Sequence, residues 1–253
     1  MTDPIDHPAE FERAAADFAA ALERVDPGSA VPACPGWTVA DLALHLGSQQ
    51  RWAAAILLSG TAQKVPDVRR RTTISWSDWY VGTTAALLAA IRAVDPDEPC
   101  WNFAPVEQRA GFWARRRLHE TAIHLVDLTQ AAEAAGKPVG TGLAVVPATV
   151  AADGVDEVFE VFVPRMLARG FAPAVTRQVG VRATDTGHEW TLTPVSAGDP
   201  PRLERGRAMG AAVLSGTAAD LVRCLWKRLP ETALTVEGDA GVAAGFLAGK
   251  VTA

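Results

Sequence analysis

Hydrophobic residues in the first half of the chain recur at helical spacing, and this pattern predicts a series of long helices. In the first helix Phe11, Ala15, Phe18 and Leu22 return every three or four residues, which places them on one helix face. Similar patterns predict three further helices, at residues 39–58, 75–94 and 107–135. Four amphipathic helices of this length are typical of a helical bundle.

Local signals mark where these helices begin and end. Thr38 is followed three positions later by Asp41, which is the spacing of a capping box at a helix start. Gly60 is expected to end the same helix, because glycine readily adopts the left-handed conformation of a helix C-terminus. Gly136 and Pro138 are expected to stop the fourth helix for related reasons.

The pattern changes after residue 140, where strands are expected for the first time. The expected elements are a helix at about residues 144–168, strands at 176–185, 188–196 and 233–239, a helix that begins at Thr217, and a short C-terminal helix. Only the dipeptide Thr186-Gly187 separates the first two strands, so we expect them to form a hairpin. The second half therefore predicts a mixture of helices and strands.

A stretch rich in glycine and proline separates the two patterns. Residues 136–142 interrupt both the helical and the strand period, as linkers do. We therefore expect an α+β protein with two domains, a helical bundle at residues 1–138 and a smaller α+β domain at residues 139–253.

Composition and charge limit the classes of function. The net charge of -5 and a pI near 5.6 show no basic excess, so nucleic acid is not an expected partner. The three cysteines lie far apart in sequence, which argues against a disulfide framework and for a reducing compartment. Neither a signal peptide nor an apolar run of membrane-spanning length is recognisable. We expect a cytoplasmic protein with no membrane association, as a monomer or homodimer.

Candidate chemistry first appears in residues 115–128, RRRLHETAIHLVDL. The stretch looks like a zinc-protease H-E-x-x-H motif, but His119 and His124 are five positions apart, which puts them about 140° apart on a helix. Glu120 and His124 are four positions apart and share one face, as two metal ligands from one helix must.

A third ligand is expected from His45 in the second helix. His45 shares a face with Gln49 and Trp52, and this face is expected to point into the bundle. A bundle can bring His45 against Glu120 and His124, which gives two histidines and one carboxylate, a set that suits catalytic zinc or another divalent ion. The alternative is a hydrogen-bonded core histidine beside a surface Glu/His pair.

The same segments resemble a known family. VPACPGWTVADLALHLGSQQRW at residues 31–52 and the H-E-T-A-x-H element at residues 119–124 resemble the mycothiol-dependent maleylpyruvate isomerase family, part of a wider DinB-like group of metal-binding four-helix bundles. LSGTAADLVRCLWKRLP and LTVEGD look like the small α+β domain that often follows the bundle in this family. The resemblance spans most of the chain.

The resemblance implies ligands and a reaction. His45, Glu120 and His124 match the family's metal ligands, and Asp127 matches an acidic position beside them. It also implies mycothiol, a sugar-linked low-molecular-weight thiol, as cofactor or cosubstrate. A mycothiol thiolate would add to an electrophilic small molecule, giving either maleylpyruvate-type cis–trans isomerisation or S-transfer. Leu125 stands where many relatives have a basic residue, which puts the substrate in doubt more than the metal.

Further site residues follow from their positions near the expected metal. We expect catalytic roles for Asp127, as the partner of a ligand histidine or else a solvated group, and for Arg223 in the second domain. Arg116 and Trp37 are expected to bind the thiol cofactor, although surface and core roles are the alternatives. Cys34 is either a nucleophile or a packing residue.

Two other functions are compatible with this pattern. A non-catalytic ligand-binding or regulatory protein could keep the same fold, but we expect such a protein to lack some of the ligands. Hydrolysis with Glu120 as general base is disfavoured because Glu120 would be occupied as a metal ligand.

Overall fold

The computed structural model describes residues 5–67, 70, 73–137, 146–172, 174–196 and 198–252. The chain divides into two compact units, residues 1–103 with 107–145 and residues 104–106 with 146–253. Of the expected linker at residues 136–142, residues 136 and 137 are described and the rest lie outside the described residues. Pro138, the expected helix stop, also lies outside them.

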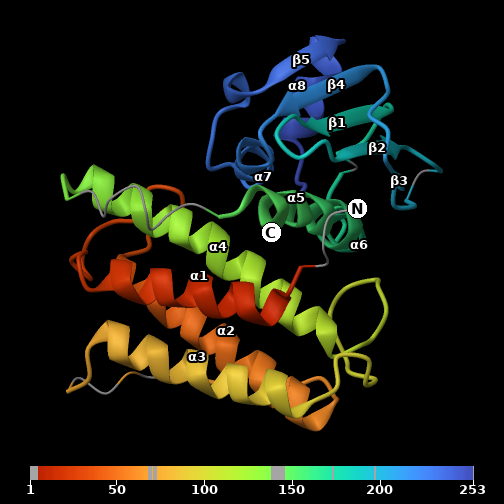
Figure 1. The fold of residues 1–253 in the computed structure, drawn as a ribbon. Helices are drawn as coiled ribbons and strands as arrows, with labels where there is room; N and C mark the ends of the chain where they lie inside the picture. Colours follow the sequence, from red (N-terminus) through yellow and green to blue (C-terminus); the bar gives the residue numbers. More distant parts are fainter. Residues whose placement is uncertain are drawn as a thin grey trace. The chain divides into compact units, whose positions relative to one another are not determined.

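The described part of the first unit is a bundle of four helices (Figure 1). They are α1 (His7–Leu22), α2 (Val39–Ser59), α3 (Trp76–Ala93) and α4 (Gly111–Ala134). Helix α1 packs mainly on α4 and helix α2 mainly on α3, while α2 also contacts α4. Helices α1, α2 and α3 bury apolar side chains against their neighbours, and α4 is buried on almost all sides between Arg116 and Leu128, so the predicted bundle is confirmed.

The predicted ends of α2 are confirmed. The Thr38 side chain accepts a hydrogen bond from the Asp41 backbone N–H, and the Asp41 side chain accepts one from the Thr38 backbone N–H. This reciprocal pair satisfies two backbone donors that the helix start leaves without a partner. At the other end Gly60 adopts φ 68°, a left-handed conformation that glycine takes without steric cost.

Helices α2 and α3 approach closely at Gly47. A Cβ built on Gly47 would lie 2.3 Å from the Trp79 ring, far inside van der Waals contact. Both residues are buried, so the ring has little room to move. Glycine in the middle of a helix costs about 1 kcal/mol relative to alanine, and here that cost permits the contact between the two helices.

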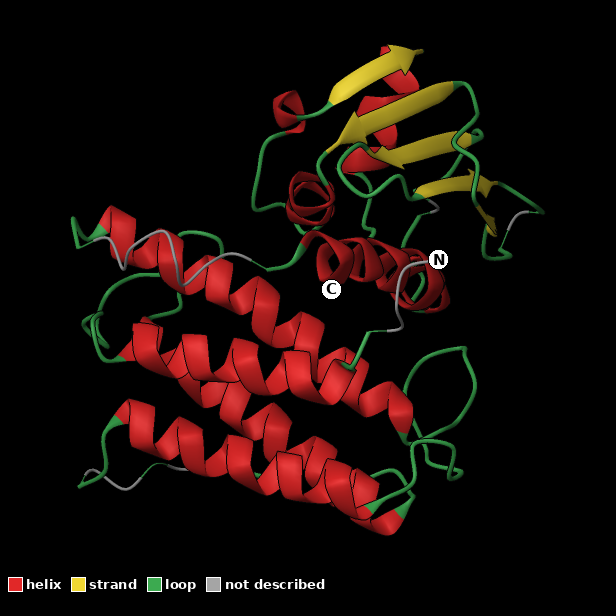
Figure 2. Cartoon of the chain, in the orientation of Figure 1, coloured by secondary structure: helices red, strands yellow, loops and turns green. Residues whose placement is uncertain are grey.

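The second unit is a five-stranded sheet with helices (Figure 2). Its elements are α5 (Ala148–Glu157), a π-helical segment (Val158–Phe162), α6 (Val163–Ala168), β1 (Val179–Ala183), β2 (Glu189–Thr193), β3 (Arg202–Arg205), β4 (Ala212–Gly216), α7 (Ala218–Leu225), a short 3₁₀ helix (Glu231–Ala233), β5 (Thr235–Gly238) and α8 (Ala240–Ala248). The fold class is α+β, as predicted.

The strand order is β3-β2-β1-β4-β5. Strands β1 and β2 pair antiparallel, with Val179 opposite Leu192, so the predicted hairpin is confirmed. Strands β1 and β4 pair parallel, whereas β4 and β5 pair antiparallel. Helix α8 packs on β1 and β4, and the ring centroids of Phe159 and Trp190 lie 6.0 Å apart between the π-helical segment and β2.

The expectation of one continuous helix at about residues 144–168 is wrong. Residues 144 and 145 lie outside the described residues, and the helix that begins at Ala148 is interrupted by the π-helical segment before α6. Pro164 explains the interruption, because proline has no N–H to donate and its ring clashes with the carbonyl four residues earlier. A π-turn absorbs this misfit without ending the helix.

Strand β3 was not expected from the sequence. Its residues read Arg-Leu-Glu-Arg, and three of the four are exposed. Such a strand carries too little hydrophobic alternation to be recognised, because it lies at the edge of the sheet and buries almost no side chain.

None of the helices in the described part of the chain combines the length and hydropathy that crossing a membrane requires.

The approach of α2 to α3 predicts opposite effects of alanine at two helical glycines. We expect Gly47→Ala to lower the free energy of unfolding by about 1–3 kcal/mol, because the new methyl group overpacks the contact with Trp79. Gly82 is exposed in α3 with nothing within 4 Å of a built Cβ, so Gly82→Ala should raise it by about 0.5–1 kcal/mol. Chemical denaturation of both variants checks this pair, and equal stabilisation would contradict the close contact.

Candidate metal centre

One face of α4 carries four ionisable residues. Arg116, Glu120, His124 and Asp127 follow one another at spacings of four, four and three, which stacks them on one side of the helix. Arg116 and Asp127 are 1% and 0% exposed, and His124 is 8% exposed. Charged groups are rarely buried unless they are paired, so these side chains must satisfy one another or a ligand.

Helix α2 brings His45 to this face. The Nε2 atom of His45 lies 3.1 Å from Oε1 of Glu120, and Nε2 of His124 lies 3.6 Å from the same oxygen. All three potential ligand atoms lie within 4.8 Å of one another. The structure thus brings together the three residues that the sequence singled out as metal ligands.

The spacing of these atoms fits a metal ion. Zinc binds histidine nitrogen and carboxylate oxygen at about 2.0–2.2 Å, which separates neighbouring ligand atoms of a tetrahedral site by about 3.3 Å. The distances from Oε1 of Glu120 to the two histidine nitrogens, 3.1 and 3.6 Å, lie on either side of that value. Two imidazoles and one carboxylate are also the ligand types of catalytic zinc sites, which keep one position open. The residues present therefore fit a divalent ion.

Asp127 orients His124. The Nδ1 atom of His124 lies 2.8 Å from Oδ2 of Asp127, and because a carboxylate only accepts, an Nδ1–H group donates to it while Nε2 faces Oε1 of Glu120. Burial acts to lower the pKa of His124, but the hydrogen bonds and charges of Asp127 and Glu120 outweigh it and raise that pKa. Ligand histidines are commonly held in this way by a carboxylate.

Arg116 holds the other oxygen of Glu120. Its guanidinium donates to Oε2, the oxygen that does not face the histidines. Burial acts to raise the pKa of Glu120, but the Arg116 charge and the hydrogen bonds from His124 and His45 hold that pKa well below its usual range. Glu120 is therefore ionised at neutral pH, as a metal ligand must be.

The turn at residues 34–37 contributes two more side chains. The Trp37 ring lies 5.0 Å from the His45 ring and 6.5 Å from the His124 ring, measured between centroids. The Sγ atom of Cys34 lies 3.6 Å from Oδ2 of Asp127. Trp37, expected to bind the thiol, thus lies against both histidines, and its role toward a thiol stays a prediction.

Other expected residues lie elsewhere or have other contacts. Arg223 belongs to the last turn of α7 in the second unit, and its catalytic role stays a prediction. Arg116 is buried against Glu120. The four-residue spacing in the sequence is compatible with this contact, but it does not show that the pair is buried. Trp52, Trp101 and Trp113 form an aromatic cluster with ring centroids 5.1 to 6.4 Å apart.

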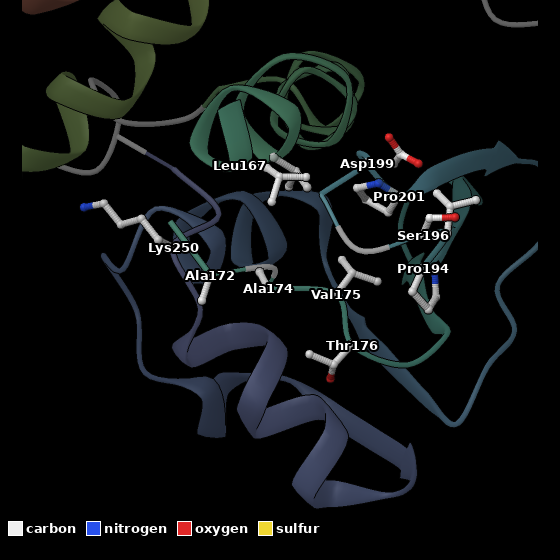
Figure 3. A pocket seen from close by; sticks show the side chains of 12 residues that line it. Leu167, Ala172, Ala174, Val175, Thr176, Pro194, Ser196, Asp199, Pro201 and Lys250 are labelled. Carbon is white, nitrogen blue, oxygen red and sulfur yellow. The ribbon is translucent and has the colours of Figure 1, made fainter. Parts of the chain in front are cut away.

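A pocket of about 310 Å³ lies within the second unit (Figure 3). Its described lining residues are mostly aliphatic, with Asp199 and Lys250 as the charged members. Histidine and cysteine are absent from this lining, so the pocket lacks the ligand types of the centre between α2 and α4.

The contact between Cys34 and Asp127 was missed by sequence reasoning. The two residues are 93 positions apart, and no local periodicity links a turn before α2 to the middle of α4. The only signal was the proximity of the Cys-Pro-Gly-Trp turn to the start of the helix that carries His45.

Comparison with known proteins agrees with this architecture. Residues 9–129 match the family model described as the mycothiol maleylpyruvate isomerase N-terminal domain, and residues 149–245 match the C-terminal domain of the same family. None of the curated protein sequences matches the chain significantly.

Two solved structures are similar in fold. One is a crystal structure of the mycothiol-dependent maleylpyruvate isomerase, with 15% sequence identity, a TM-score of 0.63 and coverage of 93% of both chains. The other is a histidine-to-alanine mutant of that isomerase, with 14% identity, a TM-score of 0.62 and the same coverage. Since both domain models of one family match in order along the chain, this protein belongs to the mycothiol-dependent maleylpyruvate isomerase family.

Proposed function

We propose that this protein is a thiol-dependent enzyme that uses a divalent metal ion, with zinc as the best fit, and mycothiol. The reaction is isomerisation or S-transfer on an electrophilic small molecule, with maleylpyruvate-type cis–trans isomerisation as the family prototype. The observation that carries the proposal is the convergence of His45, Glu120 and His124 from two helices within 4.8 Å. Family membership supports mycothiol as the thiol.

Three residues would hold the metal, and two further residues would position two of those ligands. His45 and His124 would each contribute Nε2, and Glu120 would contribute Oε1. Asp127 would keep His124 in the tautomer that leaves Nε2 available, and Arg116 would fix the Glu120 carboxylate through its other oxygen. We therefore treat Asp127 and Arg116 as positioning residues, since each acts through a ligand.

The ion would supply a Lewis acid with an open position, where a thiol of ordinary pKa near 8.5 is stabilised as thiolate at neutral pH. Addition of such a thiol to an electrophilic double bond would form a carbon–sulfur bond and place a proton on the neighbouring carbon. After rotation about the single bond, loss of that proton together with cleavage of the carbon–sulfur bond would give the isomer and regenerate the thiol. If the adduct is released, the outcome is S-transfer.

Glu120 is poorly suited to hydrolytic chemistry. Its two carboxylate oxygens are directed at the histidines and at Arg116, and its pKa is held low by the Arg116 charge against the effect of burial. A general base near neutral pH needs a higher pKa and a free oxygen. Thiol-independent, metal-dependent hydrolysis of a panel of esters would overturn this inference.

Metal content tests the ligand set directly. We expect the parent protein to hold about one equivalent of divalent metal, and the His45→Ala/His124→Ala double variant to hold almost none. His119→Ala is the matched control, since His119 is on the same helix but outside the ligand set. Elemental analysis after purification without chelators measures all three proteins, and circular dichroism checks that they fold.

The same proteins separate catalysis from binding alone. We expect mycothiol-dependent turnover of maleylpyruvate or of another conjugated electrophile by the parent and by His119→Ala, and none by the double variant. A metal-loaded parent that binds mycothiol but turns over no member of an electrophile panel would favour a ligand-binding or regulatory protein. A parent that takes up no added metal would remove the basis of the proposed chemistry.

The Asp127 contact predicts a graded loss of metal affinity. We expect Asp127→Ala to weaken zinc binding by about 10–100-fold, the usual cost of removing an outer partner of a ligand histidine. Asp127→Asn keeps an acceptor for the His124 Nδ1–H group but removes the charge, so its loss should be smaller. Competition with a chromophoric chelator gives both affinities, and equal affinity of all three proteins would contradict the role assigned to Asp127.

A further inference from the structure

We propose that Cys34 is a positioning residue of the candidate metal centre, whose thiol donates to Asp127 and thereby fixes the carboxylate that orients His124. The inference rests on the proposed function for the identity of the ligand set. It assigns to the Cys34 thiol neither the nucleophile's role nor a place among the metal ligands.

The contact converges on a single carboxylate oxygen. Oδ2 of Asp127 lies 2.8 Å from Nδ1 of His124 and 3.6 Å from Sγ of Cys34. A thiol is a weak donor, but a charged acceptor strengthens the hydrogen bond. Asp127 is 0% exposed, so water does not reach this carboxylate freely. Each hydrogen bond that it accepts from the protein is therefore electrostatically stronger than the same bond at the surface.

The side of the imidazole on which Cys34 lies excludes a direct role in binding the ion. Cys34 contacts the same Oδ2 atom of Asp127 that lies against Nδ1, whereas Glu120, with His45 beside it, lies at Nε2. The two nitrogens of an imidazole point in different directions. Cys34 therefore cannot join the ligand set while His124 contributes Nε2, but it can influence that atom through the Asp127–Nδ1 hydrogen bond.

The turn that carries Cys34 is held firmly by its backbone. The Cys34 N–H donates to the Val31 carbonyl at 3.0 Å, the Trp37 N–H donates to the Cys34 carbonyl at 3.0 Å, and the Val31 N–H donates to the Trp37 carbonyl at 2.9 Å. Gly36 adopts φ 86°, which few residues other than glycine adopt. Cys34 is thus presented to Asp127 by a fixed backbone.

The same turn leads directly into the helix that carries the third ligand. Thr38 caps α2, and His45 follows about two helical turns later. One local structure therefore sets both the start of the helix with His45 and the hydrogen bond to the partner of His124. The turn is continuous with α2, which carries His45, and it contacts α4, which carries His124, through Cys34 and Asp127. It can therefore align the two histidines with each other.

Three variants test the proposal. We expect Cys34→Ala to weaken zinc binding by about tenfold, near the lower end for outer partners of a ligand, and to change the visible spectrum of the cobalt-substituted protein. Cys34→Ser keeps a hydroxyl donor and should recover most of the affinity and the spectrum. Cys100→Ala is the matched control, because Cys100 is a buried thiol near the carbonyls of Ile56 and Trp101 and is absent from the ligand group.

A second measurement does not depend on metal. In the metal-free parent the ¹⁵N NMR signals of the His124 ring should show a hydrogen-bonded Nδ1–H group, whereas Cys34→Ala should shift the Nδ1 signal, because the carboxylate that accepts from it is no longer held, and Cys34→Ser should resemble the parent. An unchanged Nδ1 signal and unchanged zinc affinity in Cys34→Ala would overturn the proposal, as would equal losses in the serine and alanine variants. If the parent binds no metal at all, the proposed function fails, and the NMR comparison alone decides the role of Cys34.

Discussion

The need to pair buried charges on α4 is the constraint from which the site follows. An isolated ion costs several kcal/mol to bury, yet Arg116, Glu120 and Asp127 are all wholly or largely removed from water. The helix offers partners only at spacings of three and four residues. Those spacings join Arg116 to Glu120 and His124 to Asp127, so much of the geometry of the candidate site is set within one helix.

The contribution of His45 depends on tertiary packing, because it comes from another helix. Its position relative to α4 is set by the bundle and by the turn that precedes α2. The distance from His45 to Glu120 and His124 therefore depends on how α2 packs against α4. A shift of α2 along α4 by one helical turn would move His45 by about 5.4 Å. Preorganised ligands of this kind lose little freedom on binding, which favours affinity.

The sequence allowed the bundle, the α+β class and the local relation of Glu120 to His124 to be predicted, because all depend on short-range periodicity. The convergence of His45 on that pair was a hypothesis that required a packing arrangement as well. The contact of Cys34 with Asp127 lay beyond reach, since it joins residues 93 positions apart through the conformation of a turn. Strand β3 and the π-turn before Pro164 were missed because exposure and local strain leave weak hydrophobic patterns.

Strands β3 and β5 stand at the two ends of the strand order, and the edge strands of a sheet are where strands from other molecules can pair. Strand β3 spans four residues and includes Arg202, Glu204 and Arg205, while β5 also spans four residues, is exposed throughout and includes Glu237. Short strands with charged side chains make poor templates for further pairing. The same polarity that made β3 difficult to recognise is thus a protection against aggregation through the sheet edges.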